Sequence, residues 1–374
     1  MSDRDCSFAS QANSETLSTP GTSSHERSIS PGDSQSQSGL TLPGASPSTA
    51  ACLSNPDSPD DPSITSQDPT LDEAINLNHM ELLTHWIVSK DMFSLDISEY
   101  PQDLSAAVKI GLEAPYLLHE MLAFSARHLA FLHPERSASY LHQAVSHQTR
   151  AVSLFNSTWT KVDKSNCVAT LLFSSILGHH LLADMLAKRE PGGLDVFITH
   201  YTQCVETNRG IYTLAKAAWP LLMESELESV MRLSSGFTSR QPRGNHCQKI
   251  EELIANSNKL DESEKEMCRR PAHYLQIGFD AMLAVEEEEQ AYRYQMIYSW
   301  TMLVPPEFAR LVSTKRPEAL VLLAYYALLL HYGRSMWQVG DAGAYILGLI
   351  GDYLGPEWDH WLEYPRKGLI QSWR

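Results

Sequence analysis

The sequence has few cysteines, and none of them has the close spacing of a metal-binding pair. Six cysteines are spread over the 374 residues: Cys6, Cys52, Cys167, Cys204, Cys247 and Cys268. Structural zinc sites usually take their thiolates from CxxC pairs, which this chain lacks. We therefore predict no zinc site. We expect the four later cysteines to be buried thiols in a reducing compartment.

Catalytic and cofactor motifs are also missing. The sequence contains no GxGxxG, GxxxxGK[ST], GxSxG or HExxH, the usual signatures of nucleotide binding, serine hydrolysis and zinc proteolysis. His180 and Asp184 fall on one helical face, and Glu357 and His360 form a single ExxH, whereas di-iron bundles need two. We expect no enzyme, no metal site and no cofactor. An all-α enzyme that uses His180, His331 and His360 is the alternative.

An excess of positive charge is absent as well. The formal net charge is −16, and residues 1–73 contribute −9 of it through eleven acidic residues and two arginines. Duplex DNA is bound through lysines and arginines that displace counterions from the phosphates. Direct DNA binding by this chain is therefore not expected.

Long apolar runs and β-type alternation are lacking too. No run of 18 apolar residues occurs, and the N-terminus has neither a basic nor an apolar signal-peptide region. We therefore predict no membrane span and no secretory signal. Residues 1–70 hold 18 serines and a single aromatic residue, which predicts a disordered, acidic Ser/Pro-rich tail.

From about residue 71 the apolar residues recur at helical spacing, and no stretch alternates like a strand. The predicted fold is therefore all-α: an irregular multi-helix bundle of antiparallel hairpins over residues 71–374, with an internal break at 233–270. Asn76 or Asn78 can cap a first helix. A hairpin is predicted over 117–155, a buried helix over 168–186, and two further helices over 196–206 and 214–231.

The stretch 316–354 is predicted to form the centre of the core. Pro317 suits the first turn of a helix, and residues 319–330 contain no charge, so this helix should be buried on all sides. Gly340, Ala344, Gly348 and Gly351 then follow at spacings that share one helical face. Two interpretations stay open, namely close packing of a second helix backbone against this face and a cavity wall that leaves room for a flat apolar ligand.

The hairpin over residues 117–155 resembles the first helical hairpin in the regulatory domain of fungal zinc-cluster transcription factors, sterol-uptake-regulator type. The matching positions are Leu118, Met121, Ala123, Ala126, His128, Leu129, Ala130, Pro134, Tyr140, Ala144, His147, Ala151 and Phe155. Residues 77–86 resemble the start of that domain, and residues 316–332 with Trp337 and Gly340 resemble its C-terminal core. The resemblance extends over about residues 75–365.

The resemblance implies a transcriptional regulator of a fungal metabolic pathway (sterol or secondary-metabolite cluster) that resides in the nucleus. Members of the family normally carry a basic cluster of six cysteines that holds two zinc ions, and the chain departs from that pattern because Cys6 and Cys52 stand alone. We therefore expect it to act through protein partners, either a DNA-binding factor or the transcription machinery. No clear import signal is present, so a cytoplasmic location is the alternative.

In the sterol-regulator branch, the resemblance further implies a domain that dimerises and binds a sterol in an apolar pocket. The ligand-binding residues implied in this chain are Tyr325, Tyr326, His331, Trp337, Gly340, Ala344 and Gly348. The alternative function is a lipid- or sterol-binding sensor or scaffold without direct DNA binding.

Overall fold

The computed structural model describes residues 75–89, 91–93, 105–158, 161–286 and 292–371. Within these ranges the chain forms α-helices and two short 3-10 helices, and no strand is found there. The predicted all-α fold is confirmed. The predicted disordered tail, residues 1–70, lies outside the described residues.

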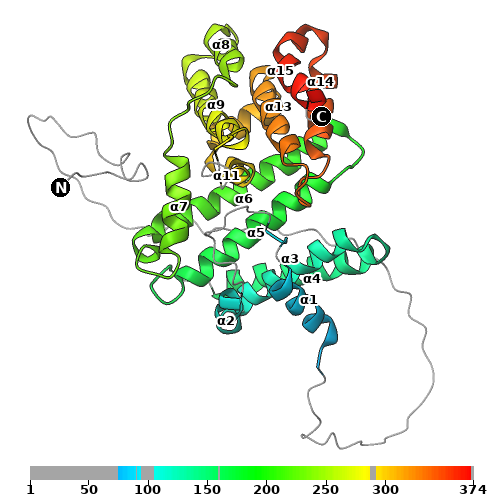
Figure 1. Cartoon of the computed structure of the whole chain (residues 1–374), viewed down its shortest axis with the longest axis vertical. Coiled ribbons are helices and arrows are strands. Elements are labelled where there is room, and N and C mark those ends of the chain that lie inside the picture. The colour runs from blue at the N-terminus through cyan, green and yellow to red at the C-terminus, as the bar shows by residue number, and fades with distance from the viewer. Residues whose placement is uncertain (1–74, 90, 94–104, 159–160, 287–291, 372–374) are drawn as a thin grey trace, which may run out of the picture.

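The first four helices form an N-terminal layer (Figure 1). They are α1 (Leu77–Val88), α2 (Ser105–Glu113), α3 (Pro115–Leu132) and α4 (Ser137–Thr158), with the 3-10 helix η1 (Pro134–Arg136) between the last two. The side chain of Asn76 accepts a hydrogen bond from the backbone N–H of His79, as a capping residue should. α3 and α4 pack along each other, so the predicted hairpin is confirmed.

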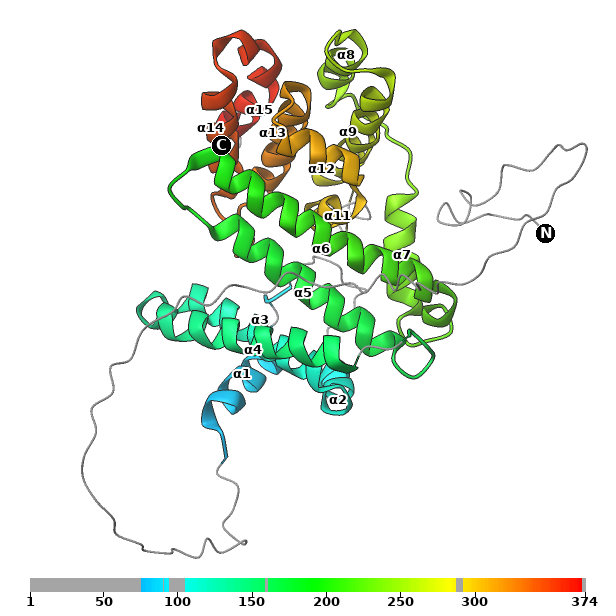
Figure 2. The same ribbon diagram turned by 180° about the vertical axis from the view of Figure 1, so that it is seen from behind.

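A long helical hairpin, α5 (Cys167–Ala187) and α6 (Gly193–Leu222), lies between this layer and the rest of the molecule (Figure 2). The prediction of two helices over 196–206 and 214–231 is wrong, because α6 joins the first range to the start of the second without a break and ends at Leu222, before residue 231. Tyr201, Cys204, Asn208 and Ile211 are all buried and keep one face of α6 against its neighbours. That unbroken stripe carries the helix past Gly210, and α7 (Glu228–Thr238) follows.

The remaining helices form a C-terminal layer on the other side of α6. They are α8 (Gln248–Asn256), α9 (Glu262–Met282), α11 (Gln295–Leu303), α12 (Pro306–Ser313), α13 (Pro317–Tyr332), α14 (Ala342–Leu354) and α15 (Asp359–Gln371), with the 3-10 helix η2 (Pro356–Trp358) before α15. Buried residues from the 233–270 segment, such as Cys247 and Leu260, belong to the same apolar cluster as α13. The predicted internal break stays a prediction.

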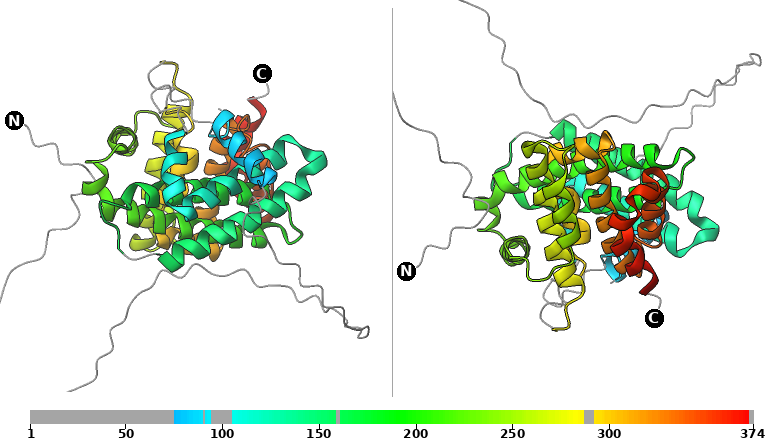
Figure 3. Two further views of the ribbon diagram at one scale, coloured as in Figure 1. Left: turned by 90° about the horizontal axis from the view of Figure 1, so that it is seen from below. Right: turned by 90° about the horizontal axis from the view of Figure 1, so that it is seen from above.

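α13 is the central helix of this layer. Pro317 occupies its first position, and every residue from Glu318 to His331 is buried, which confirms the sequence-based prediction. α9 packs on one side of α13, while α14 and α15 pack on the other, as the view from above in Figure 3 shows. The apolar surface of α13 therefore has helices on several sides.

The glycine that lets α14 approach α13 is Gly343. A Cβ atom added to Gly343 would lie 2.5 Å from the backbone nitrogen of His331 and would clash with the carbonyl oxygen of Ala327. Gly348 is exposed, and Gly340 precedes the helix with a φ of +50°; a Cβ added at either position meets nothing within 4 Å. The close-packing interpretation is therefore wrong at Gly340 and Gly348.

Among the helices that the structure describes, α5 alone is long and apolar enough to cross a membrane by length and composition. Buried residues make up 56% of its apolar window, and α5 packs between α3 and α6. The core helix of a globular fold has the same properties, so α5 has a sufficient explanation as a core helix.

Candidate functional site

The seven residues implied to bind a ligand do not converge on one place. Tyr325 is fully buried and stacks on Tyr364, with ring centroids 5.4 Å apart. The neighbouring Tyr326 points elsewhere, because its hydroxyl donates to the carbonyl of Ile297 (2.8 Å) and its ring stacks on Trp300. His331 is buried near the end of α13. The ligand-binding role of these residues stays a prediction.

Trp337 belongs to a different environment. It lies in the connection between α13 and α14, and this connection reaches the N-terminal layer. The indole ring stacks on His128 of α3 at 4.7 Å, and its N–H donates to the carbonyl of Met92 at 3.0 Å. The side-chain amide of Gln338 donates to the same carbonyl at 3.0 Å. We name this contact between the layers the seam, defined by Met92, His128, Trp337 and Gln338.

A buried ionic network adjoins the seam. Glu120 of α3 has no exposed surface, and its carboxylate lies 3.0 Å from Nδ1 of His180 on α5. The other imidazole nitrogen of His180 lies 3.7 Å from the carboxylate of Asp184, which also accepts a hydrogen bond from Arg127 at 2.6 Å. The guanidinium of Arg127 lies 5.7 Å from the centre of the Trp337 ring. The network therefore runs from α5 through α3 to the seam.

The geometry of the network favours a proton between Glu120 and His180. Burial raises the pKa of Glu120, although the hydrogen bond from His180 partly offsets that effect. Burial alone would lower the pKa of His180, but the hydrogen bond to Glu120 and the charge of Asp184 raise it. Both shifts favour a state in which the Glu120–His180 pair shares one proton. The second carboxylate oxygen of Glu120 has no hydrogen-bond partner among the described residues.

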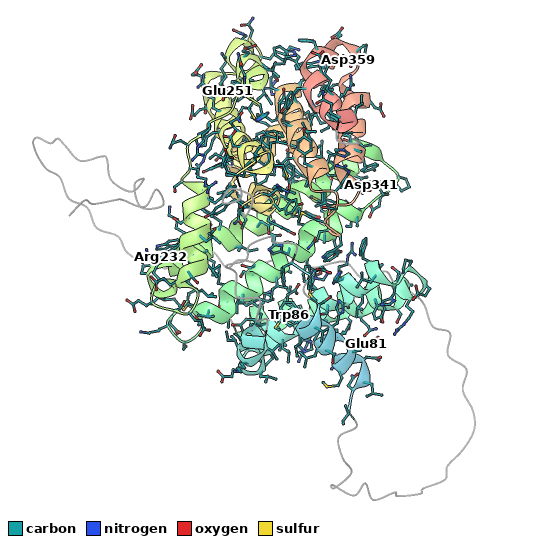
Figure 4. The ribbon with its side chains drawn as sticks, viewed as in Figure 1. Glu81, Trp86, Arg232, Glu251, Asp341 and Asp359 are labelled. Carbon is teal, nitrogen blue, oxygen red and sulfur yellow. The ribbon has the colours of Figure 1, made fainter. Side chains whose placement is uncertain are left out.

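An ion pair also ties the α13–α14 connection to the α5–α6 turn. Arg189 donates to the carboxylate of Asp341 at 2.5 Å, and its guanidinium lies 4.3 Å from the centre of the Tyr345 ring. Figure 4 labels Asp341 at the end of the C-terminal layer that faces this turn. The connection between α13 and α14 is therefore fixed to α3 at Trp337 and to the middle hairpin at Asp341.

Sequence reasoning found part of this arrangement. The shared helical face of His180 and Asp184 was recognised, but their partners Glu120 and Arg127 were missed. A signal was present, because Glu120 and Arg127 are isolated charges in the apolar helix over 115–132. Charges that interrupt a buried face often mark a polar network. Glu357 and His360 are both exposed, and the described part of the chain brings no metal-binding group of histidines, cysteines and carboxylates together.

A cavity of about 300 Å³ lies at the start of the loop after α7, against α9. Its polar side includes Arg240, Arg243 and His246, and its apolar side includes Ile277 and Leu283. None of the seven implied ligand residues lines it.

The cavity wall is held in shape by one carboxylate. Asp280 accepts hydrogen bonds from the backbone N–H groups of Arg243 (2.7 Å) and Gly244 (3.0 Å) and from the side chain of Gln276 (2.7 Å). A Cβ atom at Gly244 would lie 2.5 Å from that carboxylate, so the turn requires glycine there.

Comparison with known proteins adds a distant similarity. No family model matches the chain. It is 23% identical over 322 residues to a protein described as a Zn(2)-C6 fungal-type transcription factor from Gibberella zeae. The match covers 81% of this chain and 64% of the relative, so the chain spans less than two thirds of that protein's length. The similarity supports the implied relation to fungal zinc-cluster regulators.

Proposed function

We propose that the chain is a transcriptional regulator that acts through its helical domain and is not an enzyme. The observation that carries the proposal is the similarity to a zinc-cluster transcription factor over 81% of the chain. The helical fold of the described residues supports the proposal, because it offers helical surfaces to protein partners.

The regulator would reach DNA indirectly. The 374 residues contain no CxxC pair and carry a net charge of −16, which disfavours contact with phosphates by these residues. A DNA-binding segment outside these residues, or a DNA-binding partner, would supply that contact in the nucleus. The resemblance to the sterol-regulator branch further favours a metabolic pathway as the target and a homodimer as the working form.

A reporter assay tests this function. The full chain is fused to an unrelated DNA-binding domain in a fungal host that carries the matching promoter. We expect reporter output to change severalfold relative to the DNA-binding domain alone. A matched fusion with Trp337→Ala should change output less, because the seam is weakened. Unchanged output from the full-length fusion, together with unchanged transcripts in a deletion strain, would refute a role in transcription.

A second candidate, a sensor of an apolar ligand, has one observation in its favour. The hydroxyl of Tyr325 is buried and has no hydrogen-bond partner among the described residues. Such a group costs free energy unless a partner is supplied, and a sterol hydroxyl could supply one. Saturable binding of a fluorescent sterol that is lost in Tyr325→Phe would support this role, and equal binding by both proteins would remove the argument from Tyr325.

A further inference from the structure

Histidines are concentrated in the N-terminal layer. Residues 75–158 hold seven of the fifteen histidines: His79, His85, His119, His128, His133, His142 and His147. Histidine changes its charge between about pH 5 and pH 8, so a layer rich in histidine can gain positive charge as the pH falls.

The histidines meet where the helices of this layer meet. Between α1 and α3, Nε2 of His85 lies 3.0 Å from Nδ1 of His128. Between α3 and α4, Nδ1 of His119 lies 3.0 Å from Nδ1 of His147. Between α1 and α4, the rings of His79 and His147 meet edge to face at 4.8 Å. Each of the three helix pairs thus has a contact between two imidazoles.

A hydrogen bond between two imidazole nitrogens has room for one proton. When both rings are neutral, one facing nitrogen donates and the other accepts, and a first added proton binds a nitrogen that faces away and leaves this hydrogen bond in place. A second added proton places N–H groups on both facing nitrogens of two cations about 3 Å apart, which repel strongly in a partly buried site. Each contact therefore survives one added proton per histidine pair and is broken by a second.

The surrounding charges do little to offset that repulsion. His85 is near Glu81 of its own helix, whose pKa is lowered by hydrogen bonds from Tyr140 and Arg136, and near His133. His128 is near Arg127 of α3 and lies under Trp337.

The second pair lies among like charges. His119 and His147 are near His79 of α1, and His119 is also near Arg150 of α4. The buried carboxylate of α3, Glu120, is hydrogen-bonded to His180 of α5, and Glu135 of η1 pairs with His133. The charged neighbours that act on these two rings are Arg150 and histidines, and they disfavour further protonation.

Burial and these neighbours favour the neutral rings. They lower the pKa of His128 to about 4 and that of His147 to about 4. The pKa values of His85 and His119 are lowered as well, mainly by burial. A histidine whose pKa is lower in the docked state stabilises docking fully above its ordinary value of about 6.5. That stabilisation is lost progressively as the pH falls towards 4.

α1 contributes two of the histidines in these contacts, His79 and His85. It lies at the outer edge of the layer and packs mainly on α3. Its buried anchors are Leu82 and Trp86, of which Figure 4 labels Trp86. Its opposite face already exposes Leu77, Met80 and Val88 to solvent. Its departure would uncover the surface of the α3–α4 hairpin at Leu122, Ala126 and Tyr140 and leave the α13 core intact.

We propose that α1 is a proton-sensitive cover of the α3–α4 hairpin. Contacts between histidines hold it at neutral pH, and their double protonation releases it in mild acid. The released state presents the apolar hairpin surface while the middle hairpin and the C-terminal layer stay folded.

Hydrogen exchange on the full chain tests the proposal. Exchange is followed by mass spectrometry from pH 7.5 to 4.5, and rates are corrected for the intrinsic effect of pH. We expect the protection of residues 77–88 to fall by about tenfold or more in mild acid, with α13 still protected. In His85→Gln with His147→Gln, which keeps polar groups that do not titrate, that pH dependence should be weakened, because neither imidazole pair can then gain two charges. His360→Gln, an exposed control on α15, should behave as the wild type.

Three results would overturn the proposal. The first is protection of residues 77–88 that does not change across this pH range. The second is a simultaneous loss of protection in α1 and α13, which is global acid unfolding. The third is an unaltered pH profile in the double variant. Protection of α13 at pH 7.5 shows whether that variant is folded, and the single variants His85→Gln and His147→Gln replace it if it is not.

Discussion

Glu120 is the most deeply buried acidic side chain of the N-terminal layer, and its state depends on one proton. Its carboxylate has 0% exposure and bonds to His180, which is itself 1% exposed. A lone charge at such a site costs several kcal/mol, whereas a pair that holds one proton is neutral overall. The sequence showed a glutamate in an apolar helix, but the partner on α5 lies 60 positions away in the chain.

Substitution of Glu120 should change the pH dependence of stability. The pKa values of both Glu120 and His180 are raised. The pair therefore stabilises the fold while it keeps its proton and loses that contribution as the pH rises through the raised value. We expect Glu120→Gln to cost about 2 kcal/mol near pH 6, because a charged hydrogen bond is lost, and less at pH 9.

Urea unfolding at pH 6 and pH 9 measures the Glu120 effect. Glu135→Gln, at an exposed position of η1, is the control and should change stability by less than about 0.5 kcal/mol. A cost for Glu120→Gln that grows from pH 6 to pH 9 would contradict the shared proton.

Two glycines of α14 should respond in opposite directions to the same substitution. Gly343→Ala forces a methyl group against the backbone of α13 and should destabilise the fold by about 2 kcal/mol or more. Gly348→Ala adds a methyl group in open space at an exposed position of α14 and should stabilise the fold by about 0.5–1 kcal/mol. Chemical denaturation of both variants makes the comparison, and equal effects would show that helix propensity alone decides both sites.

Spacing alone could not select Gly343. The 4-4-3 pattern of Gly340, Ala344, Gly348 and Gly351 is regular, but α14 carries few polar residues that would show which face is wet. Which face of α14 contacts α13 is decided by the tertiary structure, because it depends on the direction in which the α13–α14 connection turns at Trp337.

At the scale of elements, predictions from the sequence worked where one pattern dominated. α13 was predicted because a proline marks its start and it has no polar face. The α3–α4 hairpin was predicted because His133-Pro134 interrupts a long stretch of apolar residues at helical spacing. The prediction that two helices occupy this region was wrong. A glycine such as Gly210 can mark the end of a helix, and only the structure shows that the buried residues on either side of it lie on one face. Local signals underestimate helices that are stabilised by tertiary packing.

The α13–α14 connection should be a stabilising link between layers. Trp337→Ala removes the stack on His128 and the N–H that donates to the Met92 carbonyl, so we expect a loss of about 3 kcal/mol. Trp337→Phe keeps an aromatic ring but not the donor and should cost about 1 kcal/mol. Urea denaturation gives the values. Hydrogen exchange of α3 should increase more than that of α9 in Trp337→Ala, and an equal increase in both would argue against a link specific to the seam.

At the scale of the whole molecule, the sequence predicted the class of fold but not its layers. Helical periodicity without strands leads to a helical bundle, and the burial of α13 follows from its composition. The position of the α5–α6 hairpin between two layers depends on which apolar faces match, and many helices here are apolar on more than one face. The contact of Trp337 with Met92 joins residues 245 positions apart, beyond the reach of any local pattern.

Whether the predicted break at 233–270 divides the molecule into separately stable parts is also a question about the whole molecule. Cys204 of α6, Cys247 before α8 and Cys268 of α9 are buried in one apolar cluster with α13. Burial raises the pKa of Cys204 and Cys268 to about 12, and it raises that of Cys247 as well. The folded chain should therefore protect these thiols from alkylation at pH 8.

Pulsed alkylation across a urea series, read by mass spectrometry at each cysteine, tests whether these parts unfold together. Because the three thiols share a core, we expect Cys204, Cys247 and Cys268 to become reactive at one common midpoint, as in a cooperative two-state transition. Cys6→Ser with Cys52→Ser removes the signal from the two cysteines before residue 75, and Cys167, which lies in a separate apolar cluster, serves as an internal comparison. If Cys247 and Cys268 instead react at lower urea than Cys204, the segment 233–270 opens independently, and the break predicted from its polar sequence is a real boundary of stability.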